Sequence, residues 1–555
     1  MDDTFSVGEI LAPLAGKVLY GSPEACFNTY CIDSRYVREG CLFVPLLGQQ
    51  RDGHQFILDA LAQGATVSLM RTGHHLVPEL LRVLNDSKDY VSAKYAQGIT
   101  LVEVRHTLVA LQKLASWYRR RFESVKVIGI TGSVGKTQTK EMLLTILNGG
   151  RKVVGTDKNF NNEIGVPLTL SKLRRDTEFA VVEMAMRGRG EISLLSRIAQ
   201  PDTGMITNTL GSHVGRLGSG IEVARAKAEI ADGMKAGAKL WLNLNDRYLP
   251  IIIQELEAKQ AIKRGLQLAY FDASSASTQT SFAPLIPSLP DDIPTIKDTS
   301  SIKPSIWLRN MARHGLDGSS LEICTPNDSV ATRLNVLGRG AVENFLCAAA
   351  LALDAGLELG DLASRSELIR PTPQRLVPYE LANGVTLIDD SYNSSPASTL
   401  DALGLLAGLG VSNKLILVLG DMLELGKYET QMHKQIVEQV YKLPPALVIG
   451  VGPRMAALRE GNVPAGFDVE LFSGIADDDY RIRQGLSVSA PNKESASGSG
   501  MVDDATIGLI TDRLLKEAAH AESRTVILVK GSRALHLERL VKSLLSYYGK
   551  EARML

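Results

Sequence analysis

The chain has 555 residues, and its 61 Lys and Arg balance 61 Asp and Glu, so the formal net charge is zero. A chain without net charge has no overall field that would attract nucleic acid or an anionic membrane surface. Apolar residues make up 45% of the sequence, which suits several globular cores, and the length predicts roughly three or four domains.

The cysteine usage and the lack of long apolar runs indicate the cellular compartment of the protein. The five cysteines are odd in number and contain no Cys-x-x-Cys pair, so neither a disulfide framework nor a zinc site is expected. Such usage is typical of a reducing environment, and we expect a cytoplasmic protein. No apolar run reaches the roughly 18 residues of a membrane-spanning helix, and the N-terminus does not resemble a signal peptide. We therefore expect no stable membrane insertion.

The first hundred residues mix short strands and turns, which predicts a small α/β domain over residues 1–106. A turn at Asp52-Gly53-His54 precedes a predicted helix over Phe56–Ala62. A second predicted helix, over Thr107–Phe122, is rich in Leu, Ala and Arg. It leads into an apolar strand that opens the next domain.

That strand ends in the segment Gly132-Ser133-Val134-Gly135-Lys136-Thr137, and a helix-forming sequence follows. Two glycines permit a tight turn in which backbone N–H groups and the helix N-terminus converge on an anion. Lys136 is then placed to reach the outer phosphates, and the Thr137 hydroxyl to bind Mg²⁺. Because Ile130 stands where the full Walker pattern has Gly, the loop is the shorter form G-x-x-G-K-T. We predict a nucleoside triphosphate site here rather than an ordinary glycine-rich turn.

Strands and helices alternate after the loop, with strands predicted at Phe179–Glu183 and Thr203–Asn208 and a helix near Ile192–Ile198. This alternation favours a parallel sheet with helices on both faces. Three polar residues in this region are candidates for chemistry: Glu183 at a strand end, His213 after the next strand, and Lys227 in a helical stretch. Taken singly, each is as readily a solvated glutamate, a loop histidine or a surface lysine.

Two segments, residues 273–304 and 487–504, are rich in Ser, Pro and other polar residues. They bury too little apolar surface to offset their ordering entropy, so we expect surface insertions. In the last third, apolar strands predict a second doubly wound sheet: Val385–Asp389, Leu415–Gly420, Ala446–Gly450 and Thr525–Lys530. We therefore predict three α/β domains, with a central parallel-sheet ATPase domain over 107–358 and a C-terminal Rossmann-like domain over 359–555.

Ten segments in this order resemble the Mur ligase family of peptidoglycan synthesis, and they cover nearly the whole chain outside the two insertions. They are Asp33-Ser34-Arg35, Asp52-Gly53-His54, Thr131–Thr137, Asn159–Pro167, Val182–Met184, Gly218-Ser219, Ala226–Ile230, Asp389–Asn393, Gly420–Gly426 and Lys530–Arg533.

The resemblance implies a ligase that couples ATP cleavage to amide-bond formation through an acyl phosphate. It implies that residues Gly132–Thr137 contact the phosphates and that Lys136 is catalytic. It also implies two Mg²⁺ ions, with Thr137, Glu183 and His213 as ligands, and a catalytic Lys227 that carries a carbamate.

The resemblance further assigns binding residues. Ser34, Arg35 and the turn at residues 52–54 match the part of the family that binds the uridine nucleotide. Asn161 and Asn162 match its muramoyl contacts. The implied C-terminal substrate contacts are Asp390, Tyr392, Asn393 and Lys530, and the implied nucleotide contacts beyond the loop are Asn344, Arg375 and Asp390.

Members that add D-alanyl-D-alanine to UDP-N-acetylmuramoyl-tripeptide match best, because Gly420–Gly426 stands where sister ligases carry Asp-Asn-Pro-Arg. A sister ligase that adds diaminopimelate or lysine, and an inactive nucleotide-binding regulatory protein, remain the alternatives. We expect the protein to be a monomer whose partners are the small molecules UDP-N-acetylmuramoyl-tripeptide and D-alanyl-D-alanine.

The sequence departs from the family pattern at Gln138, at Ser395-Pro396 and at Gly340-Ala341, where the family usually has Thr, Asn-Pro and His-Asn. We expect adenine recognition to differ in detail, and restored His-Asn at 340 and 341 to strengthen ATP binding.

Overall fold

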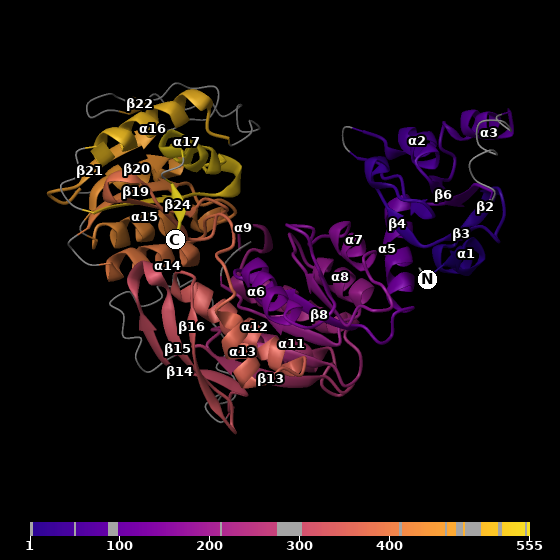
Figure 1. Ribbon diagram of the computed structural model, residues 1–555, viewed down its shortest axis with the longest axis horizontal. Coiled ribbons are helices and arrows are strands. Elements are labelled where there is room, and N and C mark those ends of the chain that lie inside the picture. Colours follow the sequence, from indigo (N-terminus) through magenta and orange to yellow (C-terminus); the bar gives the residue numbers. More distant parts are fainter. Residues whose placement is uncertain are drawn as a thin grey trace.

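The computed structural model describes residues 4–48, 51–86, 98–210, 214–274, 302–409, 413–443, 445–460, 463–472, 481–482, 501–519, 524–549 and 552–555. Its described strands form one two-stranded pair and three larger sheets, and the larger sheets follow one another along the chain (Figure 1). The predicted three-domain α/β architecture is confirmed. The exact domain boundaries stay a prediction, and the two predicted insertions lie almost entirely outside the described residues.

The N-terminal sheet has the strand order β2-β7-β6-β5-β4, in which β4 to β7 are parallel and β2 is antiparallel. One face packs on α2 and α3, and the other packs on α1 and α5. The element bounds are β1 Phe5–Ser6, α1 Val7–Leu14, β2 Lys17–Tyr20, β3 Cys26–Phe27, β4 Thr29–Cys31, η1 Ser34–Tyr36, β5 Cys41–Phe43, η2 Gly53–Phe56, α2 Ile57–Ala62, β6 Ala65–Arg71, α3 Val77–Asp86, β7 Thr100–Val104 and α5 Thr107–Arg119.

The central sheet has the order β16-β15-β14-β13-β12-β11-β8-β10-β9 and is parallel up to the β14–β15 hairpin. Helices α6, α12 and α13 cover one face, and α5, α7, α8, α10 and α11 cover the other. Its strands are β8 Lys126–Thr131, β9 Val153–Gly155, β10 Phe179–Glu183, β11 Thr203–Ile206, β12 Lys239–Asn243, β13 Gln267–Asp272, β14 Ile306–Arg313, β15 Ser319–Cys324 and β16 Ser329–Leu334. Its helices are α6 Lys136–Asn148, α7 Gly165–Leu170, α8 Glu191–Ala199, α9 Val214–Leu217, α10 Gly220–Ala228, η3 Glu229–Gly233, α11 Leu249–Ala258, α12 Arg339–Asp354 and α13 Leu359–Ser366.

The C-terminal sheet has the order β22-β21-β20-β19-β23-β18-β17-β24, with α14 and α15 on one face and α16 and α17 on the other. Its elements are β17 Val377–Glu380, β18 Val385–Asp390, α14 Pro396–Gly408, β19 Lys414–Gly420, η7 Gly426–Tyr428, α15 Glu429–Val440, β20 Pro445–Val451, β21 Asp468–Phe472, β22 Arg481–Ile482, α16 Asp504–Ala519, β23 Thr525–Lys530, α17 Glu538–Tyr548 and β24 Arg553–Met554. The parallel run from β18 to β21 confirms the predicted doubly wound arrangement.

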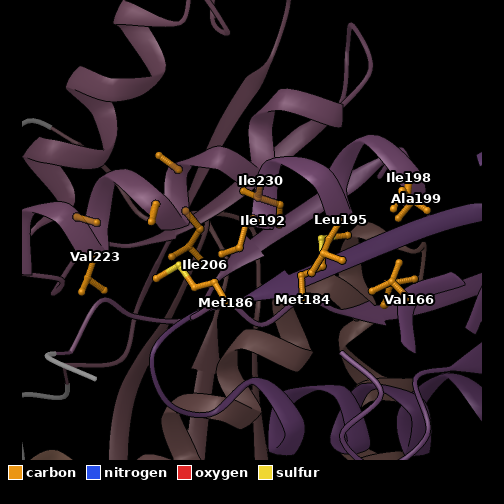
Figure 2. Close-up of a cluster of buried hydrophobic side chains, with 14 of the residues drawn as sticks. Val166, Met184, Met186, Ile192, Leu195, Ile198, Ala199, Ile206, Val223 and Ile230 are labelled. Atoms are coloured by element: carbon orange, nitrogen blue, oxygen red, sulfur yellow. The ribbon is translucent and has the colours of Figure 1, made fainter. Parts of the chain in front are cut away.

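A buried apolar cluster fixes the elements that carry the candidate site (Figure 2). Met184 follows Glu183 at the end of β10, and Val223 and Ile230 flank Lys227 along the chain. Their side chains pack with residues of α7, α8 and β11, such as Val166 and Leu195. Burial of these side chains therefore holds the strand end and α10 in one rigid unit.

Among the described residues, no helix has the length and apolar character required to cross a membrane.

Candidate active site

The loop between β8 and α6 has the conformation that its two glycines make possible. A Cβ at Gly132 would overlap the Thr207 hydroxyl, and a Cβ at Gly135 would overlap the Asn344 side-chain amide. Gly135 also has a φ of 89°, in the left-handed region that favours glycine. The spacing of the glycines in the sequence therefore reflects two close approaches that no larger residue permits.

Asn208, just beyond β11, clamps this loop. Its Oδ1 accepts a hydrogen bond from the Val134 N–H at 3.0 Å, and its Nδ2 donates to the Val134 carbonyl at 3.1 Å. The Ser133 N–H donates to the Asn208 carbonyl at 2.8 Å. Sequence analysis assigned Asn208 no role beyond its place at the end of a predicted strand, and that place is the only signal that could have identified it.

Lys136 begins α6 and turns back over the loop. Its ammonium donates to the carbonyls of Gly132 at 2.8 Å and Ser133 at 3.3 Å. Burial lowers the pKa of Lys136, and the nearby charge of Arg375 lowers it further, while Glu183 opposes the shift. These electrostatic effects place a lysine, an arginine and a glutamate close to one another around the loop.

Glu183 is the carboxylate at the centre of the site. Its Oε1 accepts hydrogen bonds from the Thr137 hydroxyl at 3.2 Å and from Asn161 Nδ2 at 2.7 Å. Its Oε2 is buried and has no partner among the described residues. Carboxylate and hydroxyl oxygens are the ligands that Mg²⁺ prefers, so the unpartnered oxygen beside Thr137 fits a divalent cation.

Asn161 and Asn162 are neighbours in sequence but have different contacts. Asn161 reaches Glu183, as described above. The Oδ1 of Asn162 accepts hydrogen bonds from the N–H groups of Ile164 at 3.2 Å and Gly165 at 2.9 Å, at the start of α7. In this structure the Asn162 carboxamide therefore supports a helix start, and its predicted contact with the muramoyl group stays a prediction.

Lys227 lies on α10, fully buried, and its Nζ has no hydrogen-bond partner among the described residues. Burial lowers the pKa of Lys227 well below its usual value, and the charge of Lys136 adds to this effect. Glu229 opposes the shift, but its carboxylate is committed to the start of α8, where it accepts from the Gly190 N–H at 2.8 Å. Both the burial and the charge of Lys136 therefore favour the neutral amine of Lys227. His213 lies outside the described residues, so its predicted place in this site is untested.

Several of the predicted C-terminal residues meet at the carboxyl ends of β18 and β23. Lys530 and Asp390 form a buried ion pair at 2.6 Å, and Lys530 also donates to the Asn393 carbonyl at 3.2 Å. The Arg375 guanidinium lies 4.2 Å from the centre of the Tyr392 ring. Burial lowers the pKa of Arg375, while Asp390, Tyr392 and Glu183 oppose the shift. Arg375 thus joins the C-terminal cluster to the phosphate loop.

The nucleotide side of the site contains one further pair. Asn344 on α12 donates from Nδ2 to Gln138 Oε1 at 3.0 Å, and its oxygen lies against Gly135. Gln138 is one of the departures from the family pattern, and the structure shows that it contacts the predicted adenine-side residue directly.

The expected benefit of His-Asn at positions 340 and 341 is not supported by the structure. A Cβ at Gly340 would lie 3.0 Å from the Asp401 carboxylate, and Ala341 is buried in the apolar core. A histidine would displace Asp401, and an asparagine would bury an amide that lacks an evident partner.

The predicted uridine-side residues lie in the N-terminal domain, at the opposite end of the molecule from the C-terminal domain (Figure 1). Arg35, on the short helix that contains Ser34, is largely exposed and pairs with Asp33 at 2.6 Å. Asp52 accepts from His54 at 2.7 Å and from His74 at 2.8 Å. Although partial burial raises the pKa of Asp52, these hydrogen bonds lower it to about 2. Sequence analysis did not identify His74.

Family models match three parts of the chain: "Mur ligase family, catalytic domain" over residues 27–119, "Mur ligase middle domain" over 130–284 and "Mur ligase, glutamate ligase domain" over 374–482. A Synechocystis protein named UDP-N-acetylmuramoyl-tripeptide–D-alanyl-D-alanine ligase is 34% identical over 424 residues, which are 76% of this chain and 78% of the relative.

Solved structures share the fold. A crystal structure of MurF from Acinetobacter baumannii superposes with a TM-score of 0.74 at 23% identity, covering 98% of this chain and 99% of the other. The structure of MurF from Thermotoga maritima in complex with ADP gives a TM-score of 0.66 at 23% identity, covering 93% and 97%.

Replacing Lys136 by alanine should abolish nucleotide-dependent turnover and leave the fold intact. The change removes the cation that stabilises charge on a transferred phosphoryl group, which should cost about 10²–10³-fold in kcat. The matched control is Lys126→Ala, which replaces an exposed lysine at the start of β8, the strand that leads into the loop. Steady-state kinetics and thermal unfolding of both variants test this prediction, and near-normal turnover in Lys136→Ala would refute the assigned role.

Asn344→Ala should weaken the discrimination between ATP and GTP. A neutral hydrogen bond contributes about 0.5–1.5 kcal/mol, so the preference for adenine should fall by a few-fold up to about tenfold. Comparison of kcat/KM for the two nucleotides measures the effect, with Gln138→Ala as the companion variant. If base preference is unchanged in Asn344→Ala, this residue does not read the adenine.

Proposed function

The chain belongs to the Mur ligase family, and on that premise we propose that it joins D-alanyl-D-alanine to UDP-N-acetylmuramoyl-tripeptide with cleavage of ATP. The observation that carries this function is the convergence of the phosphate loop, the half-satisfied carboxylate of Glu183 and the partnerless Lys227. Such a set of groups suits a phosphoryl-transfer site. The Synechocystis relative is named for this ligation.

The proposed reaction has two steps. The terminal carboxylate of the tripeptide attacks the γ-phosphorus of ATP, an O–P bond forms, and ADP leaves. The amine of D-alanyl-D-alanine then attacks the acyl phosphate, forms the amide, loses a proton and expels inorganic phosphate. The acyl phosphate makes a carboxylate oxygen a good leaving group, as covalent activation does in general.

The protein supplies position and charge compensation for these steps. The backbone N–H groups of the loop and the Lys136 ammonium hold the β- and γ-phosphates. Arg375, which lies next to the Tyr392 ring, adds a second cation on the C-terminal side. In the structure Lys136 donates to two loop carbonyls, and a bound phosphate oxygen would replace these weak acceptors.

Bound Mg²⁺ neutralises phosphate charge in such reactions. The Thr137 hydroxyl and the Glu183 carboxylate would hold one ion, because one Glu183 oxygen is buried beside Thr137 without a partner. We assign His213 and a carbamate on Lys227 to a second ion. Support for the carbamate is the buried, unpartnered Lys227 amine, whose lowered pKa favours the unprotonated form that reacts with CO₂. The N–C bond forms as the amine releases a proton, and the product is an anion.

Substrate contacts in the proposal follow the sequence assignments. Ser34 and Arg35 contact the uridine nucleotide, Asn161 the muramoyl peptide, and Tyr392 and Asn393 the reacting region. Lys530 acts through Asp390, with which it pairs at 2.6 Å. We further propose a cytoplasmic monomer without membrane insertion or nucleic-acid binding, supported by the zero net charge and the cysteine usage.

Phosphate release by the purified protein should require ATP, Mg²⁺, UDP-N-acetylmuramoyl-tripeptide and D-alanyl-D-alanine together. Omission of either acceptor or dipeptide should reduce release to background, because the acyl phosphate must form and then be attacked. The matched panel replaces the pair by UDP-N-acetylmuramoyl-dipeptide with lysine or diaminopimelate. Turnover only with that pair would assign the sister activity, and no turnover with any pair would contradict a catalytic role.

Lys227→Ala should be almost inactive, and a short carboxylic acid in the assay should partly restore turnover by replacing the carbamate anion. Lys235→Ala, which removes an exposed lysine of the central domain that pairs with Asp202 and not with the site, serves as the control. A carbamate signal should appear in the ¹³C spectrum of the wild type after exposure to labelled bicarbonate and be lost in Lys227→Ala. An active preparation in which Lys227 carries a bare amine would contradict the carbamate.

A further inference from the structure

The backbones of the central and C-terminal domains are in direct contact at Gly215. Gly215 on α9 donates its N–H to the Glu424 carbonyl at 3.1 Å. A Cβ at Gly215 would lie 2.6 Å from the Gly426 nitrogen, and a Cβ at Gly426 would lie 2.5 Å from Gly215 Cα. Figure 1 shows α9 between the two domains. This contact is too close for any side chain on either glycine.

An exposed ion pair borders this backbone contact. Arg216 lies 3.4 Å from Glu424, and both side chains are substantially exposed to solvent. Exposed pairs contribute little to association. The specificity of the contact therefore lies in the backbone hydrogen bond and the close approach of the two glycines.

A second point of contact lies on the other side of the nucleotide region. Asp401 on α14 accepts hydrogen bonds from the N–H groups of Arg339 at 2.8 Å and Gly340 at 3.0 Å, which begin α12. A Cβ at Gly338 would lie 2.7 Å from the Asp401 carboxylate. A carboxylate at a helix N-terminus satisfies backbone donors and interacts favourably with the helix dipole. Here the capping residue comes from a different domain than the helix.

Both contacts hold the C-terminal domain beside the charged groups of the phosphate loop. The charge of Arg375 acts on Lys136, and that of Glu183 acts on Arg375, so these groups lie close together as the domains are placed. A C-terminal domain that moved away would carry Asp390 and Tyr392 with it, because Asp390 ends β18 and Tyr392 lies just beyond that strand. Helix α9, in turn, packs on α10, which carries Lys227.

We propose that Gly215, Gly426 and Asp401 are positioning residues that dock the C-terminal domain on the central domain and so complete the site around the phosphate loop. This inference rests on the proposed ligase function. None of the three residues is placed to touch the reacting atoms. Their effect is on the fraction of molecules in which Arg375 and Tyr392 face the nucleotide.

The test compares Gly215→Ala, Asp401→Ala and the double variant with Gly408→Ala as the control. A Cβ at Gly408, on the same helix as Asp401, meets no atom within 4 Å. For each protein we would measure kcat, the Kd of ADP with Mg²⁺, Tm, and the radius of gyration by small-angle scattering with ADP bound.

Gly215→Ala should lower kcat at least tenfold while its Tm stays near the wild-type value. Its ADP Kd should rise only by the contribution of Arg375, because the phosphate loop is untouched. The scattering should show a larger radius of gyration than that of the wild type. Because the two contacts are separate and each favours the same docked arrangement, their free energies should add, so the losses in kcat should roughly multiply in the double variant. Gly408→Ala should behave as the wild type does.

Three results would overturn the proposal: an unchanged kcat in Gly215→Ala, an unchanged radius of gyration in every variant, or a double variant no slower than either single variant. A parallel loss of ADP affinity and Tm would likewise show a role in folding and not in docking. If the wild type failed to ligate the dipeptide, the proposed function would fall, whereas the scattering comparison would still decide whether these contacts hold the domains together.

Discussion

The arrangement of the candidate site depends on one buried carboxylate, Glu183. It ends strand β10 of the central domain's sheet and is almost completely excluded from solvent. A buried anion needs cations and hydrogen-bond donors around it. Thr137 and Asn161 donate hydrogen bonds to one of its oxygens. Burial lowers the pKa values of Lys136 and Arg375, and the negative charge of Glu183 opposes this shift. The other carboxylate oxygen has no hydrogen-bond partner among the described residues. This unpartnered oxygen makes the site suited to a divalent cation.

Two lysines share this environment in opposite ways. Lys136 keeps acceptors for its ammonium in the loop carbonyls, so it serves as a cation for phosphate. Lys227 has no acceptor, and burial together with the charge of Lys136 favours its neutral amine. The same physical cause, desolvation, thus lowers the pKa of both lysines, and in the proposed function one binds phosphate while the other carries a carbamate.

The site also belongs to more than one domain. The central sheet supplies the phosphate loop and Glu183, while Asp390 ends a strand of the C-terminal sheet and Tyr392 lies just beyond it. Charge compensation at the phosphates therefore depends on how the two domains meet. Gly215 and Gly426, where the two domains touch, and the Asp401 carboxylate that caps α12 thus act on the reaction through the position of the C-terminal domain. None of these residues carries a reacting group.

Much of the fold was predictable because its signals are local. Alternation of apolar strands with helices gave the strands Phe179–Glu183 and Thr525–Lys530 with their observed bounds, and the pattern of glycines placed the phosphate loop. The family resemblance supplied the roles of Glu183 and Lys227, which their local sequence left open. The predicted strand Thr203–Asn208 was two residues too long, because Asn208 leaves the strand to bind the loop.

What the sequence by itself determined was the fold class, the order of the elements and the phosphate loop, since these follow from spacing along the chain. Only the tertiary structure decided that Asn208 clamps Val134, that Asp401 caps α12, and that Gly215 meets Gly426. The partners in these contacts are more than 60 residues apart and show no shared period or motif. Their meeting is fixed by the packing of whole sheets and helices, which no local pattern encodes.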